Sequence, residues 1–301
     1  MLVLAPLAVA YRTGRFFHSR FLLRPSLGNR SHLLPLIVMG SLRAGGSGKT
    51  PTVSELALYL STQGKRVGIL AYWLTNPGLN KPGGFQKDPI EVFRDSDWRT
   101  TSDEAVLLAR ETNARVFVTR NREQAWDELS RSGEFDLLIS DDGLMDPRLS
   151  DAFKIVLREA GESPGIFDLL PSGSYHLTTA ALKDADYVGG CERELIFPRG
   201  FDFTKLYWAF CGIGNPENFQ QNLLSAGVRL AGFTASRDHI LPDLEKVKTQ
   251  GEKVGAHGFL CTAKDGIKLG SFPAIVIRER IRLEPGLILA IEQYLRPRSS
   301  S

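Results

Sequence analysis

The chain has 301 residues, of which 43% are hydrophobic and 24% are charged. This composition is typical of a globular protein with one large domain or two smaller ones, and it excludes a disordered, collagen-like or coiled-coil chain. No run of eighteen apolar residues occurs, which excludes a conventional transmembrane helix. The three cysteines, Cys191, Cys211 and Cys261, lie far apart without a CxxC pair, which fits a reducing compartment and argues against a zinc ribbon or disulfide framework.

Positive charge is concentrated near the start of the chain. The first 50 residues contain seven basic residues and no acidic one, although the net charge of the whole chain is only +3. Because the arginines follow the apolar run at 1–10 rather than precede it, we do not expect a secretory signal. We predict that residues 1–30 form a basic amphipathic helix on an anionic membrane surface. The alternative is a terminal helix packed on the body of the protein with solvated arginines.

The remaining chain alternates between strand and helix patterns. We expect strands at 32–42, 66–73, 114–120, 135–143 and 152–159, helices after residue 50 and at 102–113 and 121–133, and a Pro/Gly-rich loop at 76–89. This alternation predicts an α/β fold with a mostly parallel sheet that has helices on both faces. We assign residues 31–204 to this core, 205–285 to a smaller α/β domain and 286–301 to a closing helix and tail.

A glycine-rich segment lies between the first predicted strand and helix. Its sequence GGSGKT at 45–50 lets successive backbone N–H groups surround a phosphate, and the following helix adds the positive end of its dipole. Lys49 would reach the β- and γ-phosphates and the Thr50 hydroxyl would bind Mg²⁺. The first glycine of GxxxxGK[ST] is Arg43 here, and a Gly-rich turn with a surface lysine is the alternative. The predicted nucleotide-binding residues are Arg43, Ala44, Gly45, Gly46, Ser47, Gly48, Lys49 and Thr50.

A pair of acids directly follows the predicted strand at 135–140. Asp141 and Asp142 come after an apolar run, and a carboxylate at a strand end suits a bound Mg²⁺. Paired acids exposed to solvent are the alternative. Because no N-K-x-D motif for guanine is present, the pattern favours ATP over GTP.

A kinase also needs a group that receives or orients the proton of the acceptor hydroxyl. Asp103 and Glu104 form an acidic pair at the start of a predicted helix, and His239 follows an aspartate in a polar turn. An aspartate at a helix start is most often a cap, and an isolated histidine in a turn is most often exposed. The residues alone therefore leave both roles open.

Read in order, these segments resemble the tetraacyldisaccharide 4′-kinase family, over about residues 30–270. The shared segments are GxxxxGGxGKTP at 40–51, DEA at 103–105, SDDGL at 140–144, LLPSG at 169–173, GIGNPENF at 212–219, DH at 238–239 and CTAKDGIKL at 261–269. The resemblance implies an ATP-dependent kinase that phosphorylates the 4′-hydroxyl of an acylated glucosamine disaccharide 1-phosphate, a lipid A precursor. It also implies attachment to the cytoplasmic face of the bacterial inner membrane, and we expect no nucleic-acid partner.

The resemblance implies a role for each matching residue. Lys49 matches a catalytic phosphate-binding position, Asp103 matches the proposed base for the sugar hydroxyl, and His239 matches a histidine that supports this base. The matching positions on the Mg²⁺ side are Thr50, Asp141, Asp142 and Glu104. The candidates for contact with the acceptor are Arg148 and His176.

The acceptor side of the pattern differs from the family more than the nucleotide side. Ala71–Thr75 stands in place of Ser-Arg-Gly-Tyr-Gly, Met145-Asp146 in place of Gln-His, and His176 in place of an arginine. Two alternatives therefore stay open. One is a kinase or ATPase of related fold with a soluble acceptor, and the other is a nucleotide-binding protein that has lost kinase activity.

Overall fold

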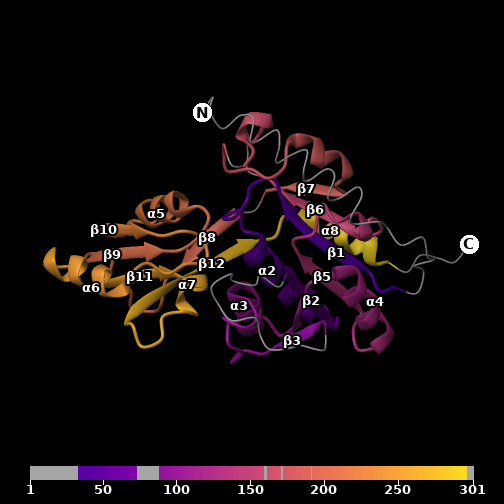
Figure 1. Ribbon diagram of the computed structural model, residues 1–301, viewed down its shortest axis with the longest axis horizontal. Helices are drawn as coiled ribbons and strands as arrows, with labels where there is room; N and C mark the ends of the chain where they lie inside the picture. Colours follow the sequence, from indigo (N-terminus) through magenta and orange to yellow (C-terminus); the bar gives the residue numbers. More distant parts are fainter. Residues whose placement is uncertain (1–32, 73–87, 159–160, 171, 191, 297–301) are drawn as a thin grey trace, which may run out of the picture.

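The structure is a computed structural model that describes residues 33–72, 88–158, 161–170, 172–190 and 192–296. These residues form two α/β units that lie side by side (Figure 1). The predicted amphipathic segment 1–30 lies outside the described residues, as does most of the predicted loop at 76–89. Within the described ranges, no helix combines the length and hydrophobicity that crossing a membrane requires.

The first unit is built on a seven-stranded sheet with the order β3-β4-β2-β5-β1-β6-β7. All neighbouring strands are parallel except β3, which runs antiparallel to β4. Its strands are β1 (Leu36–Ser41), β2 (Val67–Tyr72), β3 (Ile90–Val92), β4 (Arg115–Thr119), β5 (Leu137–Asp141), β6 (Phe153–Leu157) and β7 (Tyr187–Gly189).

Helices cover both faces of this sheet, because successive side chains of a buried strand point to opposite faces. In β1, Ile37 and Met39 pack on the face covered by α2 (Lys49–Thr62), α3 (Asp103–Glu111) and α8 (Pro285–Leu295). Leu36 and Val38 pack on the face covered by α4 (Arg122–Ser132). The predicted fold class, a mostly parallel sheet between two helical layers, is therefore confirmed for the described residues.

The second unit is a smaller five-stranded sheet with the order β10-β9-β11-β12-β8. Helix α5 packs on one face through Phe219 and Leu223, and helix α6 packs on the other through Val247. The elements are β8 (Glu192–Ile196), β9 (Leu206–Cys211), α5 (Pro216–Ser225), β10 (Arg229–Ala235), α6 (Leu244–Lys253), β11 (Gly258–Thr262), α7 (Ala263–Gly266) and β12 (Ala274–Arg282). Among the described residues before this unit, the 3₁₀ helices are η3 (Pro147–Leu149), η4 (Ile166–Asp168) and η5 (Thr179–Asp184).

The strand pairing divides the chain differently from the expected boundary at residue 204. Strand β8 precedes that boundary, yet it pairs antiparallel with β12 and belongs to the second sheet. After β12 the chain returns to the first unit, where α8 buries Leu287 and Ile291 against the first sheet. The Tyr294 hydroxyl of α8 also lies 3.2 Å from the Leu36 amide nitrogen of β1. The second unit is thus an insertion between β7 and α8.

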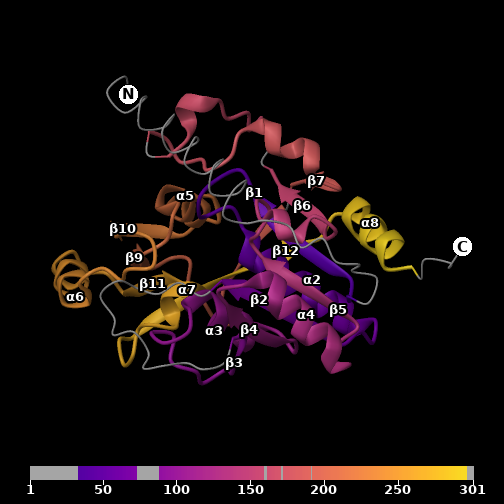
Figure 2. The same cartoon turned by 45° about the vertical axis from the view of Figure 1, so that its right-hand side comes forward.

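The ends of several strands meet where the two units adjoin. The segment after β1 and the start of α3 belong to the first unit. The segments after β9, β10 and β11 belong to the second unit. Helix α3 lies next to α7 in both views (Figures 1 and 2). Ligands of open parallel sheets bind at the carboxyl ends of strands, so the junction is the expected place for a functional site.

The role of α8 can be tested by truncating its buried face. Ile291 is fully buried, so Ile291→Ala should lower the free energy of unfolding by about 2–5 kcal/mol. Leu289 lies on the same helix but is 52% exposed, so Leu289→Ala should change it by no more than about 0.5 kcal/mol. Urea unfolding of both variants measures the difference. Equal effects would show that α8 does not pack on the first sheet.

Candidate active site

The glycine-rich loop after β1 has backbone conformations that favour glycine. Gly48 caps α2 with φ of 80°, and Gly46 has φ of 64°, both in the left-handed region that favours glycine. A Cβ atom on Gly46 would lie 2.5 Å from the Cβ of Asn215, so this position also needs glycine for space. The Lys49 ammonium donates to the Ser41 and Ser47 hydroxyls at 3.0 and 3.2 Å.

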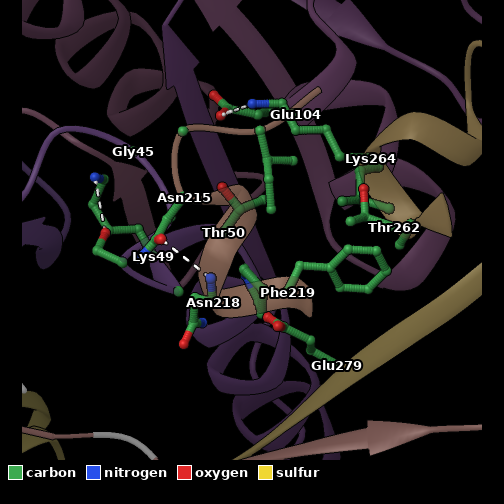
Figure 3. Close-up of a pocket in the computed structure, with 18 of the residues that line it drawn as sticks. Gly45, Lys49, Thr50, Glu104, Asn215, Asn218, Phe219, Thr262, Lys264 and Glu279 are labelled. Atoms are coloured by element: carbon green, nitrogen blue, oxygen red, sulfur yellow. Dashed lines mark hydrogen bonds and ion pairs between the residues drawn. The ribbon is translucent and has the colours of Figure 1, made fainter. Parts of the chain in front are cut away.

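This loop forms one wall of a cavity between the two units. The opposite wall comes from the segments after β9, β10 and β11 and from β12 (Figure 3). Apolar lining side chains are Pro51, Leu107, Ile213, Phe219, Ala263 and Ile277. Polar and charged lining side chains are Ser47, Lys49, Thr50, Glu104, Glu111, Arg193, Asn215, Asn218, Asp238, Thr262, Lys264 and Glu279. A cavity with this mixture suits a ligand that has both a ring and charged groups.

The two acids after β5 occupy different environments. The Thr50 hydroxyl donates to Asp141 Oδ2 at 2.8 Å. Burial, together with the nearby charge of Glu104, raises the pKa of Asp141 to about 7. Asp142 has a left-handed φ of 70°. Burial acts to raise the pKa of Asp142, but the charge of Lys49 and of other nearby positive groups outweighs burial, so this pKa is lowered.

Asp103 and His239 meet across the junction of the two units. His239 Nδ1 lies 3.0 and 3.1 Å from the two carboxylate oxygens of Asp103. The side-chain cap of α3 is Ser102, whose hydroxyl accepts from the Ala105 amide at 3.3 Å. The Asp103 carboxylate is therefore not the N-cap of its helix; it contacts His239 and also accepts from the Glu104 amide at 2.9 Å.

Electrostatic effects on the two partners favour their charged forms. Burial acts to raise the pKa of Asp103, but the hydrogen bond from His239 and the charges of Lys264 and Lys268 outweigh it and hold that pKa well below its ordinary value. Burial acts to lower the pKa of His239, but the hydrogen bond to Asp103 outweighs it, so the pKa of His239 is raised.

Two lysines lie close to this pair, Lys264 in α7 and Lys268 just after it. The sequence motifs assigned them no role. Lys264 donates to Glu104 Oε1 at 3.0 Å and to Asp238 Oδ1 at 3.2 Å. Lys268, four residues later, forms an ion pair with Asp103. Both lysines lie in the segment CTAKDGIKL that carries the family resemblance, and their i, i+4 spacing after a strand places the two side chains on one side of a helical turn.

A sequence profile identifies the family to which the chain belongs. The family model described as tetraacyldisaccharide-1-P 4′-kinase matches residues 1–195 and 198–296. The chain belongs to the tetraacyldisaccharide-1-P 4′-kinase family. The resemblance seen in the sequence motifs is thereby confirmed.

Individual relatives agree with this assignment. A protein of Halorhodospira halophila named tetraacyldisaccharide 4′-kinase is 31% identical over 303 residues, covering 94% of this chain and 89% of its own. One of Actinobacillus succinogenes with the same name is 29% identical over 260 residues, covering 79% of this chain and 76% of its own. A crystal structure of LpxK from Aquifex aeolicus in complex with ATP has a TM-score of 0.63 at 22% identity, covering 98% of this chain and 100% of that one, which supports the fold.

The two predicted acceptor contacts lie outside the cavity of this 4′-kinase family member. Arg148 Nε and Nη2 donate to the Asp146 carboxylate at 2.8 and 2.7 Å, and its Nη1 donates to Asn121 at 3.1 Å. His176 Nε2 lies 3.0 Å from the Ser41 carbonyl oxygen, at the end of β1. Their predicted contact with an acceptor stays a prediction.

The first two predicted nucleotide-binding residues brace the glycine-rich loop from outside the cavity. The Ala44 amide donates to the Ser174 carbonyl at 2.9 Å. Arg43 Nη2 donates to the Tyr175 hydroxyl at 3.2 Å, and the guanidinium lies 5.0 Å from the centre of the Tyr175 ring. Of the residues predicted to bind nucleotide, Gly45, Gly46, Ser47, Gly48, Lys49 and Thr50 line the cavity.

The raised pKa of Asp141 predicts a pH-dependent stability. In the unfolded chain Asp141 ionises near pH 3.9, roughly the ordinary value, whereas the folded protein retains its proton up to about pH 7. Between these two pH values the unfolded state binds fewer protons than the folded state. The free energy of unfolding therefore decreases as the pH rises. Asp141→Asn removes this loss while keeping an oxygen for Thr50, so its Tm should exceed that of the wild type at pH 8.

Thermal unfolding without nucleotide or metal at pH 8 and pH 4.5 checks this expectation. The Tm advantage of Asp141→Asn should shrink at the lower pH, where the wild-type carboxyl is protonated. Asp95→Asn, at an exposed position, is the control and should show no such trend. An advantage independent of pH would contradict the titration of Asp141.

Proposed function

We propose that this protein transfers the γ-phosphoryl group of ATP to the 4′-hydroxyl of tetraacyldisaccharide 1-phosphate and so forms lipid IVA. The observation that carries the proposal is the Asp103–His239 contact, which joins the two units beside the cavity that holds the glycine-rich loop. Membership of the tetraacyldisaccharide-1-P 4′-kinase family supports the same reaction.

The glycine-rich loop is proposed to hold the triphosphate. The amides at the start of α2 and the Lys49 ammonium supply positive potential for the phosphate oxygens. The apolar side chains of Leu107, Ile213 and Phe219 would take the adenine ring. This arrangement would direct the γ-phosphate toward the junction of the two units.

The residues at the end of β5 fit a Mg²⁺ ion. The Thr50 hydroxyl and the buried Asp141 carboxylate are in contact, and the pKa of Asp141 is raised by burial and by the nearby Glu104 charge, two effects that a cation would offset. We assign these two residues to Mg²⁺, with Glu104 and Asp142 nearby. The described ranges hold no cluster of three or more histidine, cysteine or acidic side chains suited to a metal, and Mg²⁺ in kinases commonly uses one or two carboxylates with phosphates and water. When bound, Mg²⁺ would neutralise charge on the β- and γ-phosphates.

The proposed transfer is an in-line displacement at phosphorus. The oxygen of the 4′-hydroxyl forms a bond to the γ-phosphorus, the bond between this phosphorus and the β,γ-bridging oxygen breaks, and ADP leaves. The hydroxyl proton passes to the Asp103–His239 pair. Because the transition state of phosphoryl transfer is loose, the pair contributes mainly by orienting the hydroxyl, and an ionised Asp103 suits this role.

The phosphate-binding lysine tests the nucleotide part of the proposal. Lys49→Met should lower the rate of bisphosphorylated product formation by at least about 10³-fold, because the charge that stabilises the transferred group is lost. Lys65→Met removes an exposed lysine just after α2 and should leave the rate unchanged. Incubation of purified protein with labelled ATP and tetraacyldisaccharide 1-phosphate, followed by separation of the lipid products, provides the measurement.

The wild-type outcome of this assay also separates the alternatives. ATP hydrolysis without transfer to the lipid would favour a soluble acceptor. Nucleotide binding without hydrolysis or transfer would favour an inactive nucleotide-binding protein. An unaltered rate in Lys49→Met would contradict the assignment of the triphosphate to the glycine-rich loop.

We also propose that residues 1–30 hold the enzyme at the cytoplasmic face of the bacterial inner membrane. Their apolar and aromatic side chains would enter the headgroup boundary, and each arginine would add about 1 kcal/mol on an anionic surface. The acyl chains of the acceptor would then stay in the membrane while its sugar reaches the site.

Deletion of residues 1–25 tests this attachment. The full chain should sediment with vesicles that contain phosphatidylglycerol, and the deleted form should do so much less, because its apolar and basic groups are gone. Raised salt should weaken binding of the full chain by screening. Vesicles of phosphatidylcholine alone are the control, and equal sedimentation of both forms with anionic vesicles would contradict the proposal.

A further inference from the structure

A buried lysine lies directly against the Asp103–His239 pair. Lys268 follows α7, and only 1% of its side chain is exposed. Its ammonium nitrogen lies 2.5 Å from Asp103 Oδ2 and 3.1 Å from the His239 carbonyl oxygen. It also lies 5.5 Å from the centre of the Trp98 ring. Among the described residues, this ammonium therefore contacts both members of the pair and one aromatic face.

A buried ammonium is costly unless its partners compensate for lost water. Lys268 obtains this compensation from the Asp103 carboxylate, the His239 carbonyl and the π face of Trp98. The Lys268 ammonium is also the positive charge closest to the Asp103 carboxylate, which is only 5% exposed. Removing this lysine would leave Asp103 buried with less cationic support.

Lys268 fixes both halves of the pair at once. Asp103 belongs to the first unit, and His239 belongs to a turn of the second with a left-handed φ of 65°. By binding the carboxylate of one and the carbonyl of the other, Lys268 constrains where the imidazole meets the carboxylate. Such a constraint matters because small misplacements of reacting groups cost large factors in rate.

The turn with His239 and the segment with Lys268 are held by a common anchor. The buried Asp265 carboxylate accepts from the Gly212 amide at 3.1 Å and from the Thr262 hydroxyl at 2.6 Å. The Gly212 carbonyl in turn accepts from the His239 amide at 3.0 Å. A Cβ atom on Gly212 would collide with the Ile240 carbonyl, so glycine is needed here. The Lys268 amide donates to the Asp265 carbonyl at 2.9 Å, so His239 and Lys268 approach Asp103 from backbone segments that share one anchor.

Lys264 and Lys268 have different positions despite their close spacing. Lys264 lines the cavity and contacts Glu104 and Asp238. Lys268 does not line the cavity, so it is not placed to touch the nucleotide. Any effect of Lys268 on the reaction must pass through the pair that it contacts.

We propose that Lys268 is a positioning residue that holds the Asp103 carboxylate and the His239 turn in the geometry needed to orient the acceptor hydroxyl. This inference rests on the proposed 4′-kinase function. It assigns Lys268 an effect on turnover and none on ATP binding.

The experiment compares Lys268→Met with Lys248→Met, which removes an exposed lysine from α6. Both are assayed with ATP and tetraacyldisaccharide 1-phosphate. Lys268→Met should lower kcat by about 10²-fold, a typical effect of misplaced catalytic groups, and should change KM for ATP by less than about threefold. Lys248→Met should behave as the wild type. A kcat within about threefold of the wild type, or a loss confined to KM, would overturn the inference.

A double-mutant cycle with Asp103→Asn tests whether Lys268 acts through the pair. If it does, Lys268→Met should slow the Asp103→Asn enzyme by less than about threefold, because the group that it positions is already altered. If the fold losses in kcat of Lys268→Met and Asp103→Asn multiply in the double variant, the inference is overturned. The double variant carries no unpaired buried charge from this ion pair, so it should fold even where Lys268→Met alone does not. A wild type that forms no lipid product would instead refute the proposed function, which keeps the two failures distinct.

Discussion

The buried Asp103 carboxylate is the constraint on which the arrangement of the site depends. Its charge lies at the start of α3 in the first unit, whereas its closest cationic partners, His239 and Lys268, belong to the second. A buried charge without partners is strongly unfavourable, so this carboxylate favours contact between the two units. The cavity that the glycine-rich loop lines lies beside that contact.

Two carboxylates near this junction have opposite electrostatic environments. Burial acts on both, but Asp103 has cationic partners that lower its pKa, whereas Asp141 has Glu104 nearby and its pKa is raised to about 7. Pairs of acids whose environments separate their pKa values commonly have different roles. Here Asp103 is suited to orient a hydroxyl, and Asp141, held by Thr50, is suited to a cation that accompanies the triphosphate.

The two residues predicted to contact the acceptor are held by local contacts outside the cavity. Arg148 is held by Asp146, one of the positions at which the sequence departs from the family pattern. His176 contacts the end of β1 behind the glycine-rich loop. The segment after β2, where the pattern also departs, lies largely outside the described residues.

The sequence by itself determined the α/β fold class, the glycine-rich loop and the acids after β5, because each depends on residues that are neighbours along the chain and follow a buried strand. It did not reveal that β8 joins the second sheet, since the side-chain pattern of a short strand does not name its partner. The resemblance included the segment that contains Lys268 but gave this lysine no role, because Lys268 meets Asp103 only after folding. The family resemblance implied that His239 supports Asp103, but the two are 136 residues apart, and the docking of two sheets that brings them into contact is specified only by the tertiary structure.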